Sequence, residues 1–299
     1  VGVWQNLQNT YDQKLIEIQC AKDIDAQVEL AKNIDYKYFV DVVGLPIARS
    51  IDDKVVNLCK YFKVADLRIM LKPDFLVNFR ASAAYNSEKN IINSRAWIQT
   101  AMNISKSIET KPYNAEKLKG YLPELRDMTV KKPEQFLPRM REIFAECGIA
   151  FVLLPHLKNS GVNGAVKWIT DERVVLAMNN RGMDADKFWF SLFHEIKHVL
   201  QQKIKTVFVS STVEEMIDIN NNLEMEADKF AMNYLIPIAD YKRLAPSRYI
   251  SDDEIVEFAR TIGIHPGIVA GRLQHEGIIA QNRCSKLKEK YVIEIKHTA

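Results

Sequence analysis

The stretch Ser191-Leu-Phe-His-Glu-Ile-Lys-His-Val-Leu-Gln201 contains two histidines, His194 and His198, with Glu195 directly after the first. Its apolar flanks predict a buried helix, with Asp184 as the N-cap. On a helix, a spacing of four residues places both imidazoles on one face, one turn apart. A catalytic zinc site uses three protein ligands and leaves a fourth position open. The stretch therefore predicts a zinc site with His194 and His198 as two of its ligands.

Glu195 has a different predicted role. It lies about 100° around the helix from His194, so it cannot easily bind the same ion but can reach a water molecule on it. Zinc lowers the pKa of such a water from about 15.7 to about 7. We therefore expect Glu195 to act as the general base, and the expected reaction is hydrolysis of a peptide bond. The alternative is a structural helix with two hydrogen-bonded histidines, because a His-Glu-x-x-His run alone is only suggestive.

The third ligand is expected from a second helix, Asn222-Leu-Glu-Met-Glu-Ala-Asp-Lys-Phe-Ala-Met-Asn-Tyr-Leu-Ile-Pro237, whose apolar residues recur at helical spacing. Glu224 lies at the edge of this apolar face, whereas Glu226 lies off it. We predict Glu224 as the ligand and keep Glu226 as the alternative. Asp228, on the same side as Glu224, is expected to accept the second N–H of a zinc-bound histidine and so fix its tautomer. Alternatively, these acids are solvated charges on a helix surface.

Taken together, His194-Glu-Ile-Lys-His198, Glu224-Met-Glu-Ala-Asp-Lys-Phe-Ala231 and Leu235-Ile-Pro237 resemble the ImmA/IrrE family of zinc metallo-endopeptidases. That family pairs a HExxH helix with a downstream E-x-x-A-[ND]-x-F-A helix that ends in L-x-P. The resemblance implies one Zn²⁺ per chain, bound by His194, His198 and an acidic residue of the second motif, with Glu195 catalytic. It also implies a protein substrate, such as a DNA-binding repressor or an antitoxin. Lys197 departs from the small residue that many members carry at this position.

A second resemblance concerns Trp4-Gln-Asn-Leu-Gln-Asn-Thr-Tyr-Asp12, which is similar to the segment that follows the helix-turn-helix in HigA-type antitoxins and related XRE regulators. The run from Gly263 to Gln274 is similar to one in helix-turn-helix-fused ImmA/IrrE proteins. The resemblance implies a helix-turn-helix upstream that this chain lacks, and DNA binding only through it. An ordinary amphipathic helix is the alternative for the first run. The alternative function is a transcription regulator or antitoxin whose zincin fold is a non-catalytic sensor or protein-binding module.

The expected fold class is α+β. Residues 1–35 carry Trp4, Leu7, Tyr11, Leu15, Ile18 and Val28 at spacings that suggest one long amphipathic helix. Ile149 to Leu154 is a continuous apolar run that predicts a buried strand, and Ala165 to Ile169 and Arg173 to Met178 predict a hairpin. We expect a three-stranded antiparallel sheet packed on the two ligand helices, as in small zincins.

Three regions are predicted along the chain. Residues 1–130 form a helical N-terminal region, residues 131–245 a zincin-like metallopeptidase domain, and residues 246–299 a helical extension that ends in a basic, partly disordered tail after Arg283. In small zincins an edge strand binds the substrate backbone, and the candidate strand here consists of Val174, Val175, Leu176, Ala177 and Met178. The oxyanion-stabilising residue stays open among Arg272, His275, Tyr234 and Tyr241, each with packing as its alternative role.

The composition of the chain limits the classes of protein to which it can belong. The 299 residues include 41 basic and 38 acidic side chains, which give a net charge of +3. This charge does not by itself indicate a nucleic-acid-binding protein. The four cysteines, Cys20, Cys59, Cys147 and Cys284, form no C-x-x-C pair and are expected to be reduced core residues of a cytoplasmic protein. No apolar run approaches the roughly 18–20 residues of a membrane span, and no secretory signal is visible. The sequence does not determine the oligomeric state, and a homodimer is one of the alternatives.

Overall fold

The computed structural model describes residues 2–22, 24–72, 87–179, 184–201, 213–244 and 250–291. The chain divides into two compact units, unit 1 (Val1–Ile104 and Leu154–Val162, with Ile295–Ala299) and unit 2 (Ser105–Leu153 and Asn163–Glu294). This division differs from the predicted boundaries near residues 130 and 245. Leu118, Leu122 and Leu125, placed by prediction in the N-terminal region, and Ile255 and Leu273, placed in the extension, share one hydrophobic core with the sheet.

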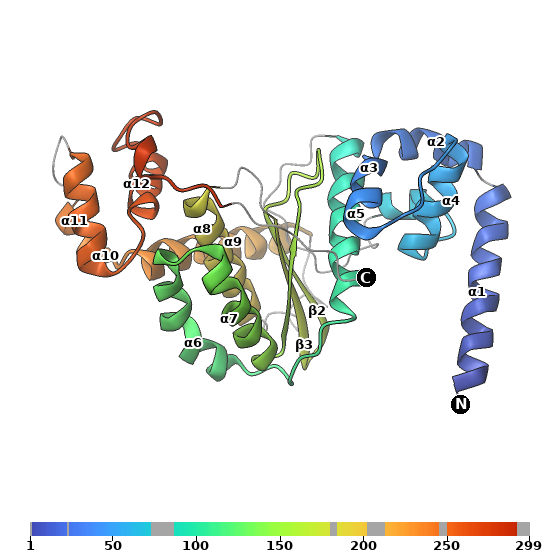
Figure 1. Cartoon of the computed structure of the whole chain (residues 1–299), viewed down its shortest axis with the longest axis horizontal. Coiled ribbons are helices and arrows are strands. Elements are labelled where there is room, and N and C mark those ends of the chain that lie inside the picture. The colour runs from blue at the N-terminus through green and yellow to red at the C-terminus, as the bar shows by residue number, and fades with distance from the viewer. Residues whose placement is uncertain are drawn as a thin grey trace. The chain divides into compact units, whose positions relative to one another are not determined.

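Unit 1 is helical (Figure 1), with α1 (Gly2–Lys22), α2 (Ile24–Asn33), α3 (Tyr36–Val43), α4 (Ile51–Phe62), the 3₁₀ helix η1 (Leu67–Leu71) and α5 (Glu88–Ser105). The predicted single helix over residues 1–35 is instead two helices, α1 and α2. α4 begins with a capping box, because the Ser50 side chain accepts the Asp53 N–H and the Asp53 carboxylate accepts the Ser50 N–H.

The core of unit 1 is aromatic. Phe39 contacts Phe62 edge to face, with ring centroids 5.5 Å apart. Trp97 of α5 is fully buried, and its indole N–H donates to the Pro155 carbonyl at 2.9 Å, an oxygen that also accepts the Tyr38 hydroxyl at 3.0 Å. These bonds satisfy polar groups that would otherwise be costly to bury.

Unit 2 carries the sheet and the predicted ligand helices. Its elements are α6 (Ala115–Asp127), the 3₁₀ helix η3 (Met128–Val130), α7 (Pro133–Glu146), β1 (Ile149–Leu154), β2 (Gly164–Thr170), β3 (Arg173–Asn179), α8 (Ala185–Leu200), α9 (Val213–Leu235), α10 (Ile238–Leu244), α11 (Asp252–Ile262), α12 (Pro266–His275) and the 3₁₀ helix η5 (Ser285–Leu287). The three strands and α8 lie within one residue of their predicted positions, whereas α9 begins at Val213, well before the predicted Asn222. The fold class α+β is confirmed.

The three strands are arranged in the order β1-β3-β2. β2 and β3 form the predicted antiparallel hairpin, with Gly164 opposite Met178. The sheet as a whole is mixed, so the prediction of a purely antiparallel sheet was wrong. β1 pairs with β3 across a long sequence separation, and a continuously apolar strand carries no pattern that tells which neighbour it takes or in which direction.

This strand order also corrects the substrate-binding prediction. Val174, Val175, Leu176, Ala177 and Met178 lie on β3, which is the central strand and has a neighbour on both sides. A strand can be added only at a free edge, so β3 cannot accept a peptide in this way. All five residues are buried, as expected for a central strand. The edge strand of the hairpin is β2.

The C-terminal segment was expected to be partly disordered, but it packs on α8 up to residue 291. Tyr291 is 2% exposed, and its hydroxyl accepts the Trp189 indole N–H at 2.7 Å. Lys288 pairs with the buried Asp186 at 2.8 Å, and the Ala185 N–H donates to the Glu289 carbonyl. The segment therefore completes the core around the start of α8. Residues 292–299 lie outside the described part of the chain.

Two expectations from composition can be compared with the structure. Cys59, Cys147 and Cys284 are reduced and buried, as predicted, and the Cys20 side chain lies outside the described residues. In the described part of the chain, no helix is both long and apolar enough to span a lipid bilayer.

Candidate metal centre

α8 carries both predicted histidine ligands on a helix that is buried along most of its length. Trp189, Leu192 and Phe193 are fully buried, and they anchor the helix in the core of unit 2. Asp184 lies at the N-cap position, as predicted, but its carboxylate pairs with Lys187 and makes no capping hydrogen bond. His194 and His198 are 7% and 6% exposed, so their side chains point into the protein.

α9 lies against α8 and supplies the acidic residues. Ala227 and Ala231 are fully buried, and such small side chains let two helices approach closely. At the C-terminal end of α9, Arg126 donates to the Tyr234 and Leu235 carbonyls, and Arg272 donates to those of Met232 and Ile236. These guanidinium groups bind carbonyls at the end of the helix, where their positive charge complements the helix dipole.

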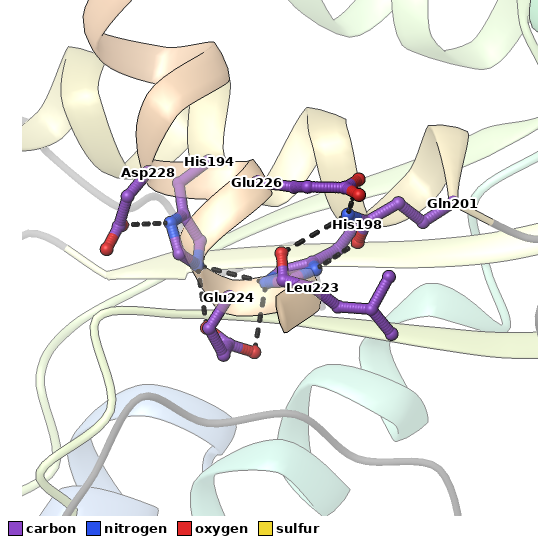
Figure 2. A network of polar contacts seen from close by, with 7 residues as sticks. All are labelled: His194, His198, Gln201, Leu223, Glu224, Glu226 and Asp228. Carbon is purple, nitrogen blue, oxygen red and sulfur yellow. Dashed lines mark hydrogen bonds and ion pairs between the residues drawn. The ribbon is translucent and has the colours of Figure 1, made fainter. Parts of the chain in front are cut away.

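The two helices bring His194, His198 and Glu224 together, as Figure 2 shows. The two Nε2 atoms lie 2.9 Å apart. One oxygen of Glu224 lies 3.2 Å from His194 Nε2, and the other lies 3.3 Å from His198 Nε2. One ligand atom from each residue lies within 4.8 Å of the others, so the group can hold a metal ion.

The choice between the two glutamates can now be made from geometry. Glu224 faces both imidazoles, whereas Glu226 is directed elsewhere (Figure 2). The Glu226 carboxylate accepts from the Gln201 amide at 3.2 Å and lies 3.4 Å from the Lys197 ammonium. The structure therefore gives Glu224 the position of the third ligand, the one chosen from the apolar face of the sequence. Lys197 lies on the outside of this cluster.

Each imidazole has an outer partner on its Nδ1 atom. His194 Nδ1 lies 2.8 Å from the Asp228 carboxylate, which is the acceptor that the sequence analysis predicted for one of the histidines. His198 Nδ1 lies 2.9 Å from the Gln201 side-chain oxygen, and the Gln201 amide donates in turn to the Leu223 carbonyl. An acceptor at Nδ1 favours the tautomer that leaves the Nε2 lone pair free for a metal. The sequence analysis did not predict a role for Gln201. The available signal was its position three residues after His198, because side chains at this spacing on a helix are neighbours.

The charged groups around His194 and Glu224 favour the binding of a cation. Burial, the largest single influence, lowers the pKa of His194, but hydrogen bonds to Asp228 and Glu224 outweigh it and raise this pKa to about 10. Burial raises the pKa of Glu224, yet hydrogen bonds to His194 and His198 outweigh that effect and hold it well below its ordinary value. The surrounding carboxylates thus favour positive charge at the point where the Nε2 atoms meet.

Glu195 follows His194 on α8 and is 5% exposed. Its charge contributes to the raised pKa of His194, so it lies within electrostatic reach of the cluster. Its side chain packs on Gly164 at the start of β2, where an added Cβ would lie 2.6 Å from Glu195 Cγ and 2.8 Å from Oε1. Gly164 was not predicted as a site residue, although a glycine inside a strand often marks such a close approach.

The four candidates for oxyanion stabilisation have packing roles in the structure. Arg272 is occupied by two α9 carbonyls and by Glu276, and its guanidinium stacks on Tyr241 at 3.8 Å. The Tyr241 hydroxyl donates to Glu276, Tyr234 stacks on a core phenylalanine, and His275 is exposed at the end of α12. The geometry therefore assigns none of them to the metal cluster.

Comparison of the chain with family models, with curated proteins and with solved structures finds no match. The case for the site accordingly rests on the described geometry. The fold and the cluster define a protein with a buried two-histidine, one-carboxylate group able to bind a metal ion.

Proposed function

We propose that the protein is a zinc-dependent endopeptidase in which Glu195 is the general base. One observation carries the proposal: two imidazoles and a carboxylate from α8 and α9 converge within 4.8 Å, in a largely buried position directly beside Glu195. A structural histidine pair needs hydrogen-bond partners, but it does not need three ligand atoms aimed at a common point together with separate acceptors on the outer nitrogens.

The residues present fit a zinc ion. Ligand atoms about 2.0–2.1 Å from a tetrahedral ion lie about 3.3–3.4 Å from one another. Each oxygen of Glu224 lies at about this distance from one imidazole nitrogen, 3.2 Å for His194 and 3.3 Å for His198. The two nitrogens, 2.9 Å apart, need to separate by only a few tenths of an ångström. Two imidazoles and one carboxylate are a ligand set found in catalytic zinc sites, where one position stays open. When bound, zinc supplies Lewis acidity, which makes water acidic near neutral pH and polarises a carbonyl group.

The protein's own residues have distinct tasks in this proposal. Asp228 and Gln201 hold the two imidazoles in the ligating tautomer and orientation. Glu195 takes the proton that water gives up and delivers it to the departing amine. Gly164 leaves room for the Glu195 side chain, which a methyl group at that position would displace.

An extended peptide is the proposed substrate class, and β2 is the proposed strand for binding its backbone. β2 lies at the edge of the sheet, and its first residue, Gly164, contacts the Glu195 side chain. A peptide added along this edge would have its backbone beside the general base. That the peptide belongs to a repressor or an antitoxin rests on the resemblance of the two sequence motifs to ImmA/IrrE proteins alone.

The test combines metal content with peptide hydrolysis. We expect about one zinc per chain by mass spectrometry for the wild-type protein and for Glu195→Gln, and much less for His194→Ala and Glu224→Gln. Glu226→Gln is the matched control, because it removes a carboxylate two residues away on the same helix that faces Gln201 and Lys197. It should retain the metal. Hydrolysis of casein and of a quenched fluorescent peptide library should be lost in Glu195→Gln.

The outcomes separate two functions. Hydrolysis that survives Glu195→Gln unchanged would contradict the assigned role of Glu195. If the wild-type protein and Glu195→Gln bind metal equally and neither hydrolyses peptides, the alternative function is favoured. In that case the protein is a transcription regulator or antitoxin whose site is a sensor or a protein-binding module. A gel shift with the protein on the promoter of its own gene would then be the next experiment.

A further inference from the structure

The outward face of α1 carries large apolar side chains that unit 1 does not cover. The exposed fractions are 80% for Trp4, 57% for Leu7, 60% for Tyr11, 48% for Leu15 and 49% for Ile18. Single exposed apolar residues are normal on protein surfaces, but five along one helix form a continuous patch. We call these five residues the α1 stripe.

The α1 stripe lies on the side of the helix that points away from the rest of unit 1. At 100° per residue, its five members fall within an arc of about 80°. The opposite side of α1 faces α4, which lies beside it in Figure 1. There Glu17 pairs with Lys60 of α4 at 3.0 Å, and Ile16 is partly buried. Both residues lie more than about 100° from the centre of the stripe. α1 therefore faces α4 with the side that carries Ile16 and Glu17, and it presents the α1 stripe outward.

The spacing of the stripe is symmetric. Its members follow one another at intervals of three, four, four and three residues, so the series reads the same from either end. About Tyr11 as the centre, Trp4 corresponds to Ile18 and Leu7 corresponds to Leu15. A twofold axis at Tyr11 would match every residue of the α1 stripe with another residue of the stripe on an antiparallel second copy. We propose that the α1 stripe is a homodimer interface of this antiparallel kind.

The charges on α1 favour the antiparallel arrangement. With the axis at Tyr11, Asp12 faces Thr10 of the second copy and Lys14 faces Gln8, and both of these residues are uncharged. A parallel pair in register would instead place Asp12 beside Asp12 and Lys14 beside Lys14. Like charges at such positions destabilise helix pairs.

The area is sufficient for a specific but weak dimer. Aromatic side chains present about 150–250 Å² each, so the stripe offers on the order of 600 Å² per copy and about 1,200 Å² in total. The total reaches the lower end of specific interfaces, and the area per copy lies at the upper end of the largest apolar patches on typical monomers. The expected behaviour is a monomer–dimer equilibrium that depends on protein concentration.

Charge exchange provides the test, using the full 299-residue chain and analytical ultracentrifugation over a range of concentrations. Leu7→Lys alone and Leu15→Glu alone should each shift the protein to monomer, at least tenfold in dissociation constant. Both substitutions in one chain should restore the dimer, because the antiparallel pair places each new cation opposite a new carboxylate. Ile47→Lys, a change of an apolar residue that is 84% exposed in the same unit, is the matched control and should leave the dimer intact.

A second measurement reports on the interface directly. Trp97 and Trp189 are fully buried, whereas Trp4 is 80% exposed, so quenching of tryptophan fluorescence by acrylamide should increase on dilution as Trp4 becomes accessible. Circular dichroism checks that each variant is folded. A wild-type protein that stays monomeric at high micromolar concentration would overturn the proposal. A dimer that survives both single substitutions would overturn it too, and failure of the combined variant to recover would overturn the antiparallel arrangement.

Discussion

Replacing Gly164 with alanine tests how closely β2 packs on the proposed general base. The three atoms nearest to an added Cβ all belong to the Glu195 side chain, at 2.6, 2.8 and 2.9 Å. The backbone of Gly164 does not lie in the left-handed region, so the substitution introduces no conformational strain of its own. Any cost of Gly164→Ala must therefore come from contact with Glu195.

The size of the effect follows from these distances. Ordinary contact begins at 3.4 Å, so Glu195 Cγ would have to retreat by about 0.8 Å from its 2.6 Å separation. Overpacking of this kind lowers the free energy of unfolding by about 1–3 kcal/mol. In a Glu195→Ala background the obstructing atoms are gone, and a compatible glycine-to-alanine change then raises this free energy by about 0.4–1 kcal/mol. The coupling energy is the difference between these two effects, so the two substitutions should show a coupling energy of about 1.4–4 kcal/mol.

The assay is urea denaturation of four proteins: wild type, each single variant and the double variant. Gly120→Ala serves as the control, because no atom lies within 4 Å of an added Cβ at that helical position, and it should stabilise the protein. Simple additivity of Gly164→Ala and Glu195→Ala would refute the packing argument. If the protein is active, a displacement of this size should also lower kcat by roughly 10- to 100-fold with metal content unchanged.

Three further predictions concern other parts of unit 2. Gln201→Leu removes the acceptor on His198 Nδ1 and should weaken metal binding by about 10- to 100-fold in a chelator competition; unchanged affinity would remove Gln201 from the site. Arg272→Met removes two hydrogen bonds to α9 carbonyls and should lower the free energy of unfolding by about 2–4 kcal/mol in urea, and a smaller loss would mean that α9 is held by packing alone. Hydrogen bonds from the backbone and side chain of Ser251 hold the pKa of Glu254 below its ordinary value of 4.5, so its stabilising effect is present above that pH and lost as the pH falls through the lower folded value. The stability difference between the wild-type protein and Glu254→Gln should therefore be present at pH 7 and absent in strong acid, and a difference that persists in acid would contradict this.

Local patterns predicted much of what the structure contains. Ser50 and Ser251 have the sequence pattern of N-caps and Gly263 that of a helix end, and all three have the corresponding geometry. The spacing of His194 and His198 placed both rings on one helical face, and the apolar face of α9 singled out Glu224. These predictions succeed because caps, turns and helical faces depend on residues within a few positions of one another.

The tertiary structure decided the features that depend on distant parts of the chain. The pairing of β1 with β3, which makes β3 central and β2 the edge, joins strands that look alike in sequence. The close contact between Gly164 and Glu195 joins residues 31 positions apart, and Tyr291 reaches back to Trp189 from a segment that reads as a polar tail. The outward direction of the α1 stripe likewise depended on which face of α1 met α4. Sequence alone thus determined the helices and the types of residue that meet in the His194, His198 and Glu224 group, because both depend on local patterns. The neighbours of each element were set by packing between segments far apart in the chain, and such packing leaves no local pattern.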